Sequence, residues 1–495
     1  MQLSFTLYIS GYLLLFLGSA MLIPAGLDYF REQPDFAFSF ATSSAVTMFW
    51  GMLFVLAFKG MYKKPTTAQM YLATTLSWIL VCSFAAIPFV FAPFSISYTD
   101  AFFEAMSGLS TMGATIYPDL DNCSDGIILW RSLLHWFGGL GIIALAMLLL
   151  PFLRIGGMQL FQMESSDKND KMRPRTVQVI CTVAVVYVAV TALCLLCLLM
   201  TELRFFEALN FSLATIPTGG FAPRNTSAVN LSAAAQYIIA FFMFISGMPL
   251  FSLYFLYKGD WKKIFGDIQI KTYFWVVVIL TAVLTTWLMV RHPEMNFFKV
   301  IRTSLFNIIS VLSSTGFNAS DLEVDGTFAV SLFIFLTPVG ACTGSTSGGI
   351  KLFRFNILTM TMVQSLRQKL MPHAVLVPKF NCRPVTTDII LSVLIFMITF
   401  CITAVISILL LSMCGLDFLT SVSAVFSALG NTGIGLGPVI GSSGPGFCSL
   451  PSFAKWVLSA DMLLGRLEFM SIFILILPMA WKRNVLGHYK SEAAF

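Results

Sequence analysis

The chain has 495 residues, of which 57% are hydrophobic and only 11% are charged. Soluble domains carry about 25% charged residues, whereas apolar runs of about 20 residues are typical of membrane spans. The composition therefore predicts an all-α polytopic membrane protein and argues against a soluble enzyme. The net charge of +6 needs no nucleic-acid partner, because basic residues gather in the cytoplasmic loops of membrane proteins.

Two apolar spans open the chain, over roughly 4–28 and 38–60. The first has no basic segment before it and no obvious cleavage site, so we expect a retained span rather than a signal peptide. Together they form a predicted N-terminal transmembrane pair over residues 1–66.

A three-part unit then recurs four times. Each unit has a long apolar span, a shorter segment ending in a turn of small residues, and a return span leading to a basic loop. The predicted segments are 69–93, 99–112 and 127–152; 177–200, 203–216 and 233–257; 273–291, 297–313 and an interrupted span from 328; and 387–412, 417–430 and 454–481. They define four pore repeats, over residues 67–175, 176–271, 272–380 and 381–495.

The basic loops all fall on one side of the predicted membrane. By the positive-inside rule this side is cytoplasmic, and ten spans then place both termini there. The four turns consequently open to the outside.

The short segments have roughly 14 residues each, which gives helices of about 21 Å against a bilayer core of about 30 Å. Each segment must therefore enter the membrane and turn back. Glycine in the turns permits positive φ and close backbone approach, so four copies can place carbonyl oxygens around a cation. Tight helix–helix packing is the alternative for any single glycine, but four turns in the same place favour a filter. The turns are Thr111-Met112-Gly113, Thr218-Gly219-Gly220, Ser314-Thr315-Gly316 and Asn431-Thr432-Gly433.

The third return span is interrupted by ten small residues, GACTGSTSGG. Irregular backbone at membrane depth is tolerated only where protein buries it or water reaches it. We therefore predict a gating loop beneath the turns in a path that the other return spans leave open; a passive hinge is the alternative. Its candidate gating residues are Gly340, Thr343, Gly344, Ser345, Thr346, Ser347, Gly348 and Gly349.

Two basic residues join the candidate gate. Lys351 follows the loop, although snorkelling to the inner interface also accounts for its position. Arg466 lies in the last span near Asp461 and Glu468, where an ionisable residue is a functional candidate. We expect Arg466 to face the path below the filter; a structural pair with a carboxylate is the alternative.

Other reactive side chains carry weaker signals. Acidic residues after two of the turns could concentrate cations, or could simply be solvated; they are Asp119, Asp121, Asp125, Asp321, Glu323 and Asp325. Cys123 and Cys448 both fall on the outer side, and nothing in the sequence decides whether they pair. The four histidines share no spacing, and no catalytic or nucleotide-binding motif occurs, so we expect neither an enzyme nor a bound cofactor.

The turns also resemble a known family, together with WRSLLHWFGGLG at 130–141, GACTGSTSGGIKLFRF at 340–355 and LLGRLEF at 463–469. They are similar to the Trk/Ktr/HKT superfamily of potassium transporters, nearest to the bacterial TrkH/TrkG type. The resemblance implies four membrane–pore-loop–membrane repeats around a central potassium path in the cytoplasmic (inner) membrane. It also implies a homodimer and a cytosolic TrkA-type regulatory subunit that binds a nucleotide, ATP/ADP or NAD. Carried over by position, the filter glycines are Gly113, Gly220, Gly316 and Gly433.

The sequence thus predicts potassium uptake through a four-repeat filter, with gating from the cytoplasm. No turn has the full TVGYG of tetrameric channels, so weaker selectivity over rubidium or sodium is expected. Passive flux and coupling to protons or sodium both remain open. A secondary transporter of a small organic solute is the alternative from another class, although the parallel repeats disfavour an inverted-repeat site.

Overall fold

The computed structural model describes residues 3–61, 67–93, 96–149, 172–250, 252, 259, 261–323, 325–373, 377–381, 383–441, 444–467 and 469–476. Three parts of the chain lie outside the described residues: the basic loop near 154–171, both chain ends and Glu468. The predicted position of the termini therefore concerns residues outside the described ones. The chain packs as two compact units. Unit 1 holds residues up to Ala105, Ser124–Ile127 and the chain from Leu467, and unit 2 holds Met106–Cys123 and Ile128–Arg466.

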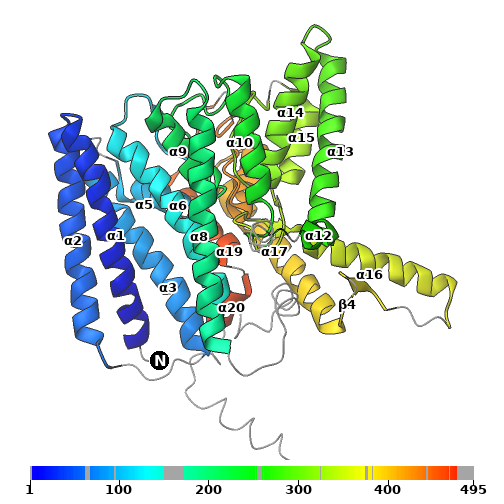
Figure 1. Ribbon diagram of the computed structural model, residues 1–495, viewed down its shortest axis with the longest axis horizontal. Helices are drawn as coiled ribbons and strands as arrows, with labels where there is room; N and C mark the ends of the chain where they lie inside the picture. Colours follow the sequence, from blue (N-terminus) through cyan, green and yellow to red (C-terminus); the bar gives the residue numbers. More distant parts are fainter. Residues whose placement is uncertain are drawn as a thin grey trace, which may run out of the picture. The chain divides into compact units, whose positions relative to one another are not determined.

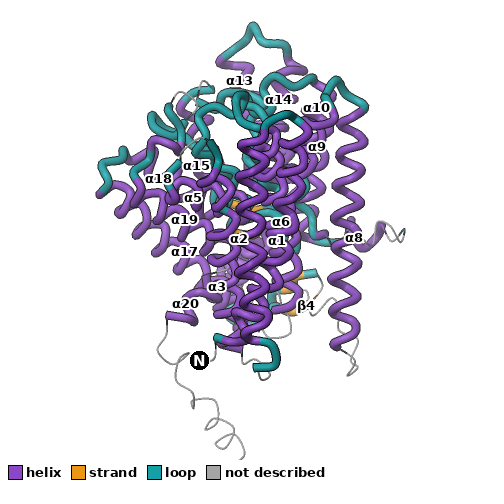
Figure 2. Tube along the Cα trace, turned by 90° about the vertical axis from the view of Figure 1, so that its left-hand side faces the viewer, coloured by secondary structure: helices purple, strands orange, loops and turns teal. Residues whose placement is uncertain are grey.

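Unit 1 is built on the N-terminal pair of helices, which lie side by side in both views (Figures 1 and 2). Small residues let them approach closely: Ser44 Oγ donates to the Gly18 carbonyl oxygen at 2.7 Å, and a Cβ on Gly18 would lie 2.7 Å from Met48 Cγ. The helices of unit 1 are α1 (Ser4–Phe30), α2 (Pro34–Phe58), α3 (Thr67–Ala85), α4 (Ile87–Phe91), the first part of α5 (Tyr98–Ser110) and α20 (Phe469–Ile476).

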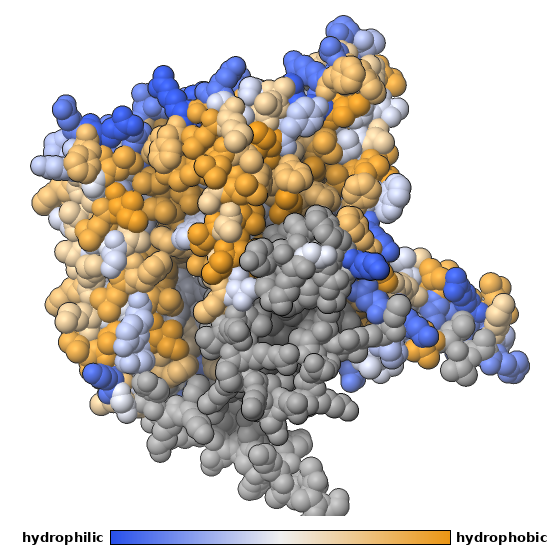
Figure 3. Space-filling model, viewed as in Figure 1, coloured by the Kyte–Doolittle hydropathy of each residue, from blue (hydrophilic) through white to orange (hydrophobic). Residues whose placement is uncertain are grey.

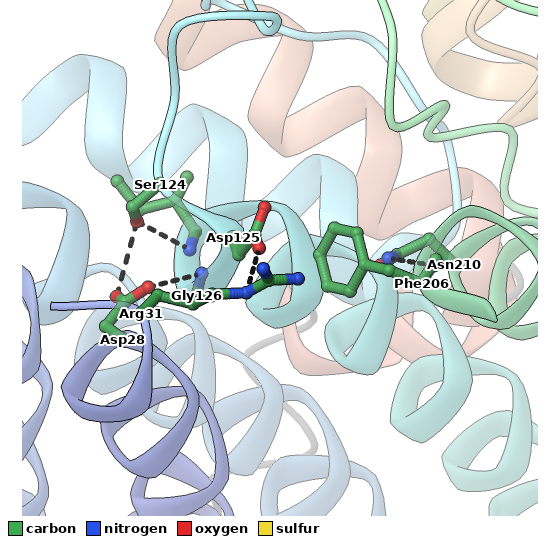
Figure 4. A network of polar contacts seen from close by, with 8 residues as sticks. Asp28, Arg31, Ser124, Asp125, Gly126, Phe206 and Asn210 are labelled. Carbon is green, nitrogen blue, oxygen red and sulfur yellow. Dashed lines mark hydrogen bonds and ion pairs between the residues drawn. The ribbon is translucent and has the colours of Figure 1, made fainter. Parts of the chain in front are cut away.

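A polar contact at the end of α1 fixes the start of the next long helix, α6 (Asp125–Leu149) (Figure 4). Asp28 accepts hydrogen bonds from the Gly126 amide at 2.7 Å and from Ser124 Oγ at 3.3 Å. Beside them Arg31 pairs with Asp125 at 2.9 Å. A carboxylate at a helix N-terminus meets unpaired amide groups and the positive end of the helix dipole.

Unit 2 repeats one order of helices, a long helix, a short helix and a return helix. Its helices are the rest of α5 and of α6, then α8 (Met172–Leu199), α9 (Phe205–Thr215), α10 (Ala233–Ser246), α12 (Trp261–Gly266), α13 (Ile268–Arg291), α14 (Phe297–Leu312), α15 (Thr327–Leu336), α16 (Leu352–Leu370), α17 (Thr387–Met413), α18 (Phe418–Gly430), the 3-10 turn η1 (Phe447–Ser449) and α19 (Ser452–Leu467). One cluster of buried apolar side chains runs from Val183 on α8 through α9, α10, α13, α14 and α15 to Leu352 on α16.

Two pairs of short strands complete unit 2. β1 (Val339–Gly340) and β2 (Ile350–Lys351) pair in parallel, and β3 (Lys379–Phe380) and β4 (Arg383–Pro384) pair antiparallel. The turn between β3 and β4 caps α13, because Asn381 Oδ1 accepts from the Ile268 amide at 3.0 Å.

Six of the described helices are long and apolar enough to cross a membrane: Ser4–Phe30, Pro34–Phe58, Gln69–Phe91, Cys181–Leu199, Ile268–Arg291 and Thr387–Met413. Their exposed faces are apolar, as Figure 3 shows for the sides of the helices, and hydrophilic side chains gather at the upper loops. On α17, for example, Leu391, Ile398 and Leu409 are each more than half exposed. The chain is therefore an all-α integral membrane protein, as the sequence predicts.

One expectation about the return spans is wrong. The sequence predicts a continuous span over 233–257, but α10 ends at Ser246 and residues Gly247–Pro249 are not helical. Proline lacks the amide that would continue the helix, and the backbone groups freed here pair with another segment, described below. The third return span is therefore not the only interrupted one.

Candidate functional site

The four short helices α5, α9, α14 and α18 end in unit 2 with one shared backbone motif. The first residue of each turn donates to the carbonyl three residues back, and the second residue of the turn donates to the carbonyl five residues back, which is a Schellman motif. For α5 these bonds are Thr111 N to Gly108 O at 3.1 Å and Met112 N to Ser107 O at 2.9 Å. The other three helices make the same bonds, with N–O distances of 2.8–3.2 Å: Thr218 to Thr215, Gly219 to Ala214, Ser314 to Val311, Thr315 to Ser310, Asn431 to Ala428 and Thr432 to Ser427.

The first residue of each turn adopts left-handed backbone without being glycine. Thr111, Thr218, Ser314 and Asn431 have φ of 57°, 56°, 57° and 50°. This conformation costs on the order of 1–3 kcal/mol for an ordinary residue, and β-branched threonine is especially rare there. The same strain at the same place in four turns indicates that the surrounding structure holds the turns in a required shape.

The third residue of each turn touches the next turn. A Cβ on Gly113 would lie 2.2 Å from the Gly219 carbonyl oxygen, and one on Gly220 would lie 1.8 Å from that of Thr315. A Cβ on Gly316 would lie 2.1 Å from the Thr432 carbonyl oxygen, and one on Gly433 would lie 2.1 Å from that of Met112. The contacts pass from the first turn to the second, third and fourth and then back to the first, so the turns form a closed ring. All twelve predicted filter residues belong to this ring.

A ring of this kind suits a cation. A backbone carbonyl of each turn lies in the ring, and each short helix ends at the ring with its negatively polarised C-terminus. Carbonyl oxygens arranged in this way can replace the water shell of an ion. The third-position glycines, with φ of 87°, 83°, 84° and 74°, leave no room for any side chain between neighbouring turns.

The segment Gly340–Gly349 is a compact loop with a closed base. The strands at its two ends pair Val339 with Ile350 and Gly340 with Lys351. Within the loop, Ser347 Oγ accepts from the Ala341 amide at 3.2 Å. The loop is thus an ordered structure rather than a slack connection.

The loop contacts three of the four turns. Its Gly348 amide donates to Ser314 Oγ at 2.6 Å, and a Cβ on Gly348 would lie 2.3 Å from the Gly430 carbonyl oxygen, directly before the fourth turn. Thr346 Oγ1 lies 3.3 Å from Thr218 Oγ1 in the second turn. The predicted gating loop therefore lies against the filter ring.

The loop is also bonded to the break after α10. The Leu250 amide donates to the Gly344 carbonyl oxygen at 3.0 Å, and the Cys342 amide donates to that of Gly247 at 3.1 Å. Thr346 Oγ1 also donates to the carbonyl oxygen of Ser246 at 3.4 Å. The interruption of α10 thus supplies backbone partners for the loop.

Both predicted basic residues reach this loop. Arg466, only 5% exposed, donates from Nη1 to the Thr346 carbonyl oxygen at 2.8 Å. Among the described residues no carboxylate pairs with Arg466. Asp461, the nearby candidate, instead accepts a hydrogen bond from Ser407 Oγ at 2.8 Å. The alternative of a structural ion pair is therefore not observed among these residues. Lys351 Nζ donates to Ser347, to its carbonyl oxygen and, at 3.0 Å, to its Oγ.

The acidic residues after the turns serve different purposes. Asn225 donates to Asp119 at 2.9 Å and to Asp121 at 3.2 Å. The bonds that Asp119 accepts from Asn225 and Asn122 hold its pKa below the usual value. Glu323 accepts from the Gly437 amide at 2.7 Å and so braces the loop after the fourth turn.

Burial has a different effect on Asp325, whose pKa it raises to about 6. Asp125, in unit 1, is the partner of Arg31 described above. Cys123 and Cys448 are not joined by a disulfide; the sulfur of Cys123 contacts the carbonyl oxygen of Asp119, and the sulfur of Cys448 contacts that of Pro445.

Three residues that the sequence analysis did not single out matter at this site. Asn225, whose Oδ1 also accepts from the Leu120 amide at 2.7 Å, joins the loops after the first and second turns. Gln269 accepts from the Thr343 amide at 3.0 Å. His135 lies directly behind Gly219. Only the quoted motif around His135 gave any signal in the sequence, because the other two contacts join distant segments.

Comparisons with known proteins agree with this geometry. The family described as TrkH, cation transport protein, matches residues 37–483. A Trk system potassium uptake protein TrkI from Halomonas elongata is 34% identical over 94% of each chain, and TrkH from Escherichia coli K12 is 31% identical over 83% of this chain and 86% of that one. A crystal structure of the potassium transporter TrkH from Vibrio parahaemolyticus superimposes with a TM-score of 0.89 at 30% identity, covering 97% of this chain and all of that one.

Proposed function

Because this chain belongs to the TrkH family of cation transport proteins, we propose that it takes up potassium ions across the bacterial cytoplasmic membrane. The relatives named above are potassium uptake proteins. The selective element is the ring of four turns, whose coordinating carbonyls belong to each third-position glycine and the two residues before it.

The single observation that carries this proposal is the closure of the ring. Each third-position glycine abuts a carbonyl oxygen of the next turn, and the fourth turn returns to the first. Carbonyls held at fixed separation by such contacts favour an ion of one size over others. The same closure favours a central path over a solute site between two inverted halves.

The loop Gly340–Gly349 acts as the gate in this proposal. Its contacts with the second, third and fourth turns support a position across the conduction path, on the inner side of the ring. Arg466, bonded to Thr346, adds a positive charge that opposes cation passage while the loop is closed.

The family resemblance supports the homodimer and the partner subunit of the proposal, the positive-inside rule supports its orientation, and the recurring sequence pattern supports its four repeats. The protein acts as a homodimer, with both termini and the basic loops in the cytoplasm. A TrkA-type subunit that binds ATP/ADP or NAD docks from that side and moves the loop. The four pore repeats keep the boundaries 67–175, 176–271, 272–380 and 381–495.

Growth rescue tests the proposal. A bacterium deficient in potassium uptake should grow at low external potassium when it carries the wild-type chain and should fail with Gly316→Ser. The substituted Cβ would overlap the Thr432 carbonyl oxygen, 2.1 Å from its ideal position. Gly415→Ser is the matched control, because Gly415 shares a φ of 84° but has nothing within 4 Å of a Cβ.

The growth of the two variants decides for or against the filter. Rescue by Gly415→Ser but not by Gly316→Ser supports the filter, whereas equal rescue by both contradicts it. Potassium flux into liposomes with and without a sodium or proton gradient then distinguishes passive from coupled uptake.

A further inference from the structure

The middle residue of the second turn differs from its counterparts. Met112, Thr315 and Thr432 carry side chains at this position, and all three are fully buried. The second turn has Gly219, whose φ is not positive. Its backbone conformation therefore does not require glycine. The reason for glycine at this position must instead be the lack of space for a side chain.

That space is filled by His135. A Cβ on Gly219 would lie 1.7 Å from His135 Nδ1, 2.4 Å from Cγ and 2.5 Å from Cε1. The imidazole thus occupies the place where a side chain of residue 219 would begin.

The fourth turn shows where a middle side chain goes when one is present. Thr432 Oγ1 donates to the Thr337 carbonyl oxygen at 3.0 Å, at the end of the return helix of the preceding repeat, α15. His135 also belongs to the return helix of the preceding repeat, α6. In both places the return helix of one repeat contacts the middle residue of the next turn. In the second turn, however, the side chain at this contact belongs to the return helix and not to the turn.

One face of α6 backs the whole second turn. Arg131, His135 and Gly139 follow one another at four-residue spacing and so lie on the same side of the helix. A Cβ on Gly139 would lie 2.6 Å from Pro217 Cβ, just before the turn.

Phe221, just after the turn, contacts both Arg131 and His135. Its ring meets the His135 ring edge-on, with centroids 4.1 Å apart, and Arg131 Cζ lies 4.0 Å from its centroid.

The imidazole gains nothing in hydrogen bonds from this position. His135 is fully buried, and neither of its ring nitrogens has a hydrogen-bond partner among the described residues. Burying polar atoms without partners costs free energy, which a leucine of similar size would avoid. Stability alone therefore does not account for histidine here.

We propose that His135 is a positioning residue for ion selectivity, which fixes the Gly219 carbonyl in the ring by replacing the absent side chain. This inference rests on the proposed function, because it assigns a role within the same filter. The Gly219 carbonyl oxygen is also the atom that Gly113 abuts. A shift of Gly219 therefore disturbs the contact between the first and second turns.

Potassium and sodium uptake by purified full-length protein in liposomes tests this proposal with two single variants. Gly219→Ala lowers potassium flux by at least about tenfold, because the new methyl group overlaps the imidazole. His135→Ala keeps potassium flux but lowers the potassium-to-sodium uptake ratio several-fold. Without the imidazole, the space beside Gly219 is empty, and the Gly219 carbonyl is no longer held in place.

The double variant His135→Ala/Gly219→Ala is the decisive measurement. The methyl group of the alanine at position 219 enters the space left by the imidazole. Both potassium flux and uptake ratio therefore return to within about threefold of wild type, as expected when substitutions of two contacting residues compensate each other. Gly141→Ala, on the same helix with nothing within 4 Å of a Cβ, is the control and leaves both quantities unchanged.

Three results overturn the proposal: wild-type flux in Gly219→Ala, an unchanged uptake ratio in His135→Ala, or a double variant in which neither flux nor uptake ratio recovers. The second result stands even if Gly219→Ala does not fold. Failure of the wild-type protein to conduct potassium would instead refute the proposed function, so the two failures are distinguishable.

Discussion

Arg466 Nη1 donates a hydrogen bond to the carbonyl oxygen of Thr346 at 2.8 Å, joining the last helix of unit 2 to the centre of the loop. Thr346 in turn contacts the carbonyl oxygen of Ile216, next to the second turn, at 3.0 Å. The guanidinium has no carboxylate partner among the described residues, so its positive charge is not neutralised there. Arg466 therefore both holds the loop and adds charge to the proposed path.

We predict that Arg466→Ala raises basal potassium flux, because it removes one anchor of the loop and one positive charge. A hydrogen bond from a charged donor contributes about 1.5–3 kcal/mol, so an increase of about tenfold is expected. Flux into liposomes without any partner subunit measures this. Lys271→Ala, which removes an exposed positive charge from α13, is the control, and an Arg466→Ala protein with wild-type flux would refute the prediction.

Deleting Thr343–Ser347 should give a leaky pore that no longer responds to a partner. The deletion removes the bonds from Thr346 to the second turn and from Gly344 to Leu250, so the shortened loop loses its hold on the second turn and on the break after α10. Basal flux in liposomes is again the measurement. A deletion variant that still closes tightly would favour the alternative of a passive hinge.

Glu323 should hold the outer end of the filter. Its Oε1 accepts from the Gly437 amide at 2.7 Å, and a Cβ on Gly441 would lie 1.9 Å from that oxygen. Glu323→Ala leaves the amide without this acceptor at a cost of about 1–3 kcal/mol. We expect a lower midpoint of thermal unfolding and a lower potassium-to-sodium uptake ratio. Glu323→Gln keeps an acceptor oxygen and should resemble wild type; equal effects of the two substitutions would contradict the bond's importance.

Asp325 should make the protein less stable as the pH rises. It is 8% exposed, and burial raises the pKa of its carboxyl to about 6, from an ordinary value of 3.8. The folded state therefore binds the proton more tightly than the unfolded state, and stability is lost as pH increases from about 4 to about 6. His292 and Arg291 oppose this effect, while Asp321 adds to it.

Asp325→Asn should accordingly stabilise the protein at pH 7.5 by on the order of 1–2 kcal/mol, with little change at pH 4. Thermal unfolding in detergent at both pH values measures it. Glu202→Gln, at an exposed position of a different loop, is the control. The same change in midpoint at both pH values would exclude titration of Asp325 as the cause.

The sequence alone determined most of the helices and the turns that end the four short ones. Apolar length predicts the spans to within a few residues, as for α17, expected over 387–412 and found over Thr387–Met413. Glycine and small hydroxyl residues mark the turns and the loop, because left-handed backbone and close approach are local requirements. The end of α10 at Ser246 was missed, since the stretch around it is as apolar as a continuous span.

Only the tertiary structure decided which atoms meet. Arg466 and Thr346 are 120 positions apart in the chain, and no local pattern in the sequence pairs them. The order of contacts around the ring and the placement of His135 behind Gly219 likewise depend on how distant helices pack. Hydropathy and turn chemistry act over a few neighbouring residues, whereas the shape of the ring is fixed by contacts between segments that meet only when the chain is folded.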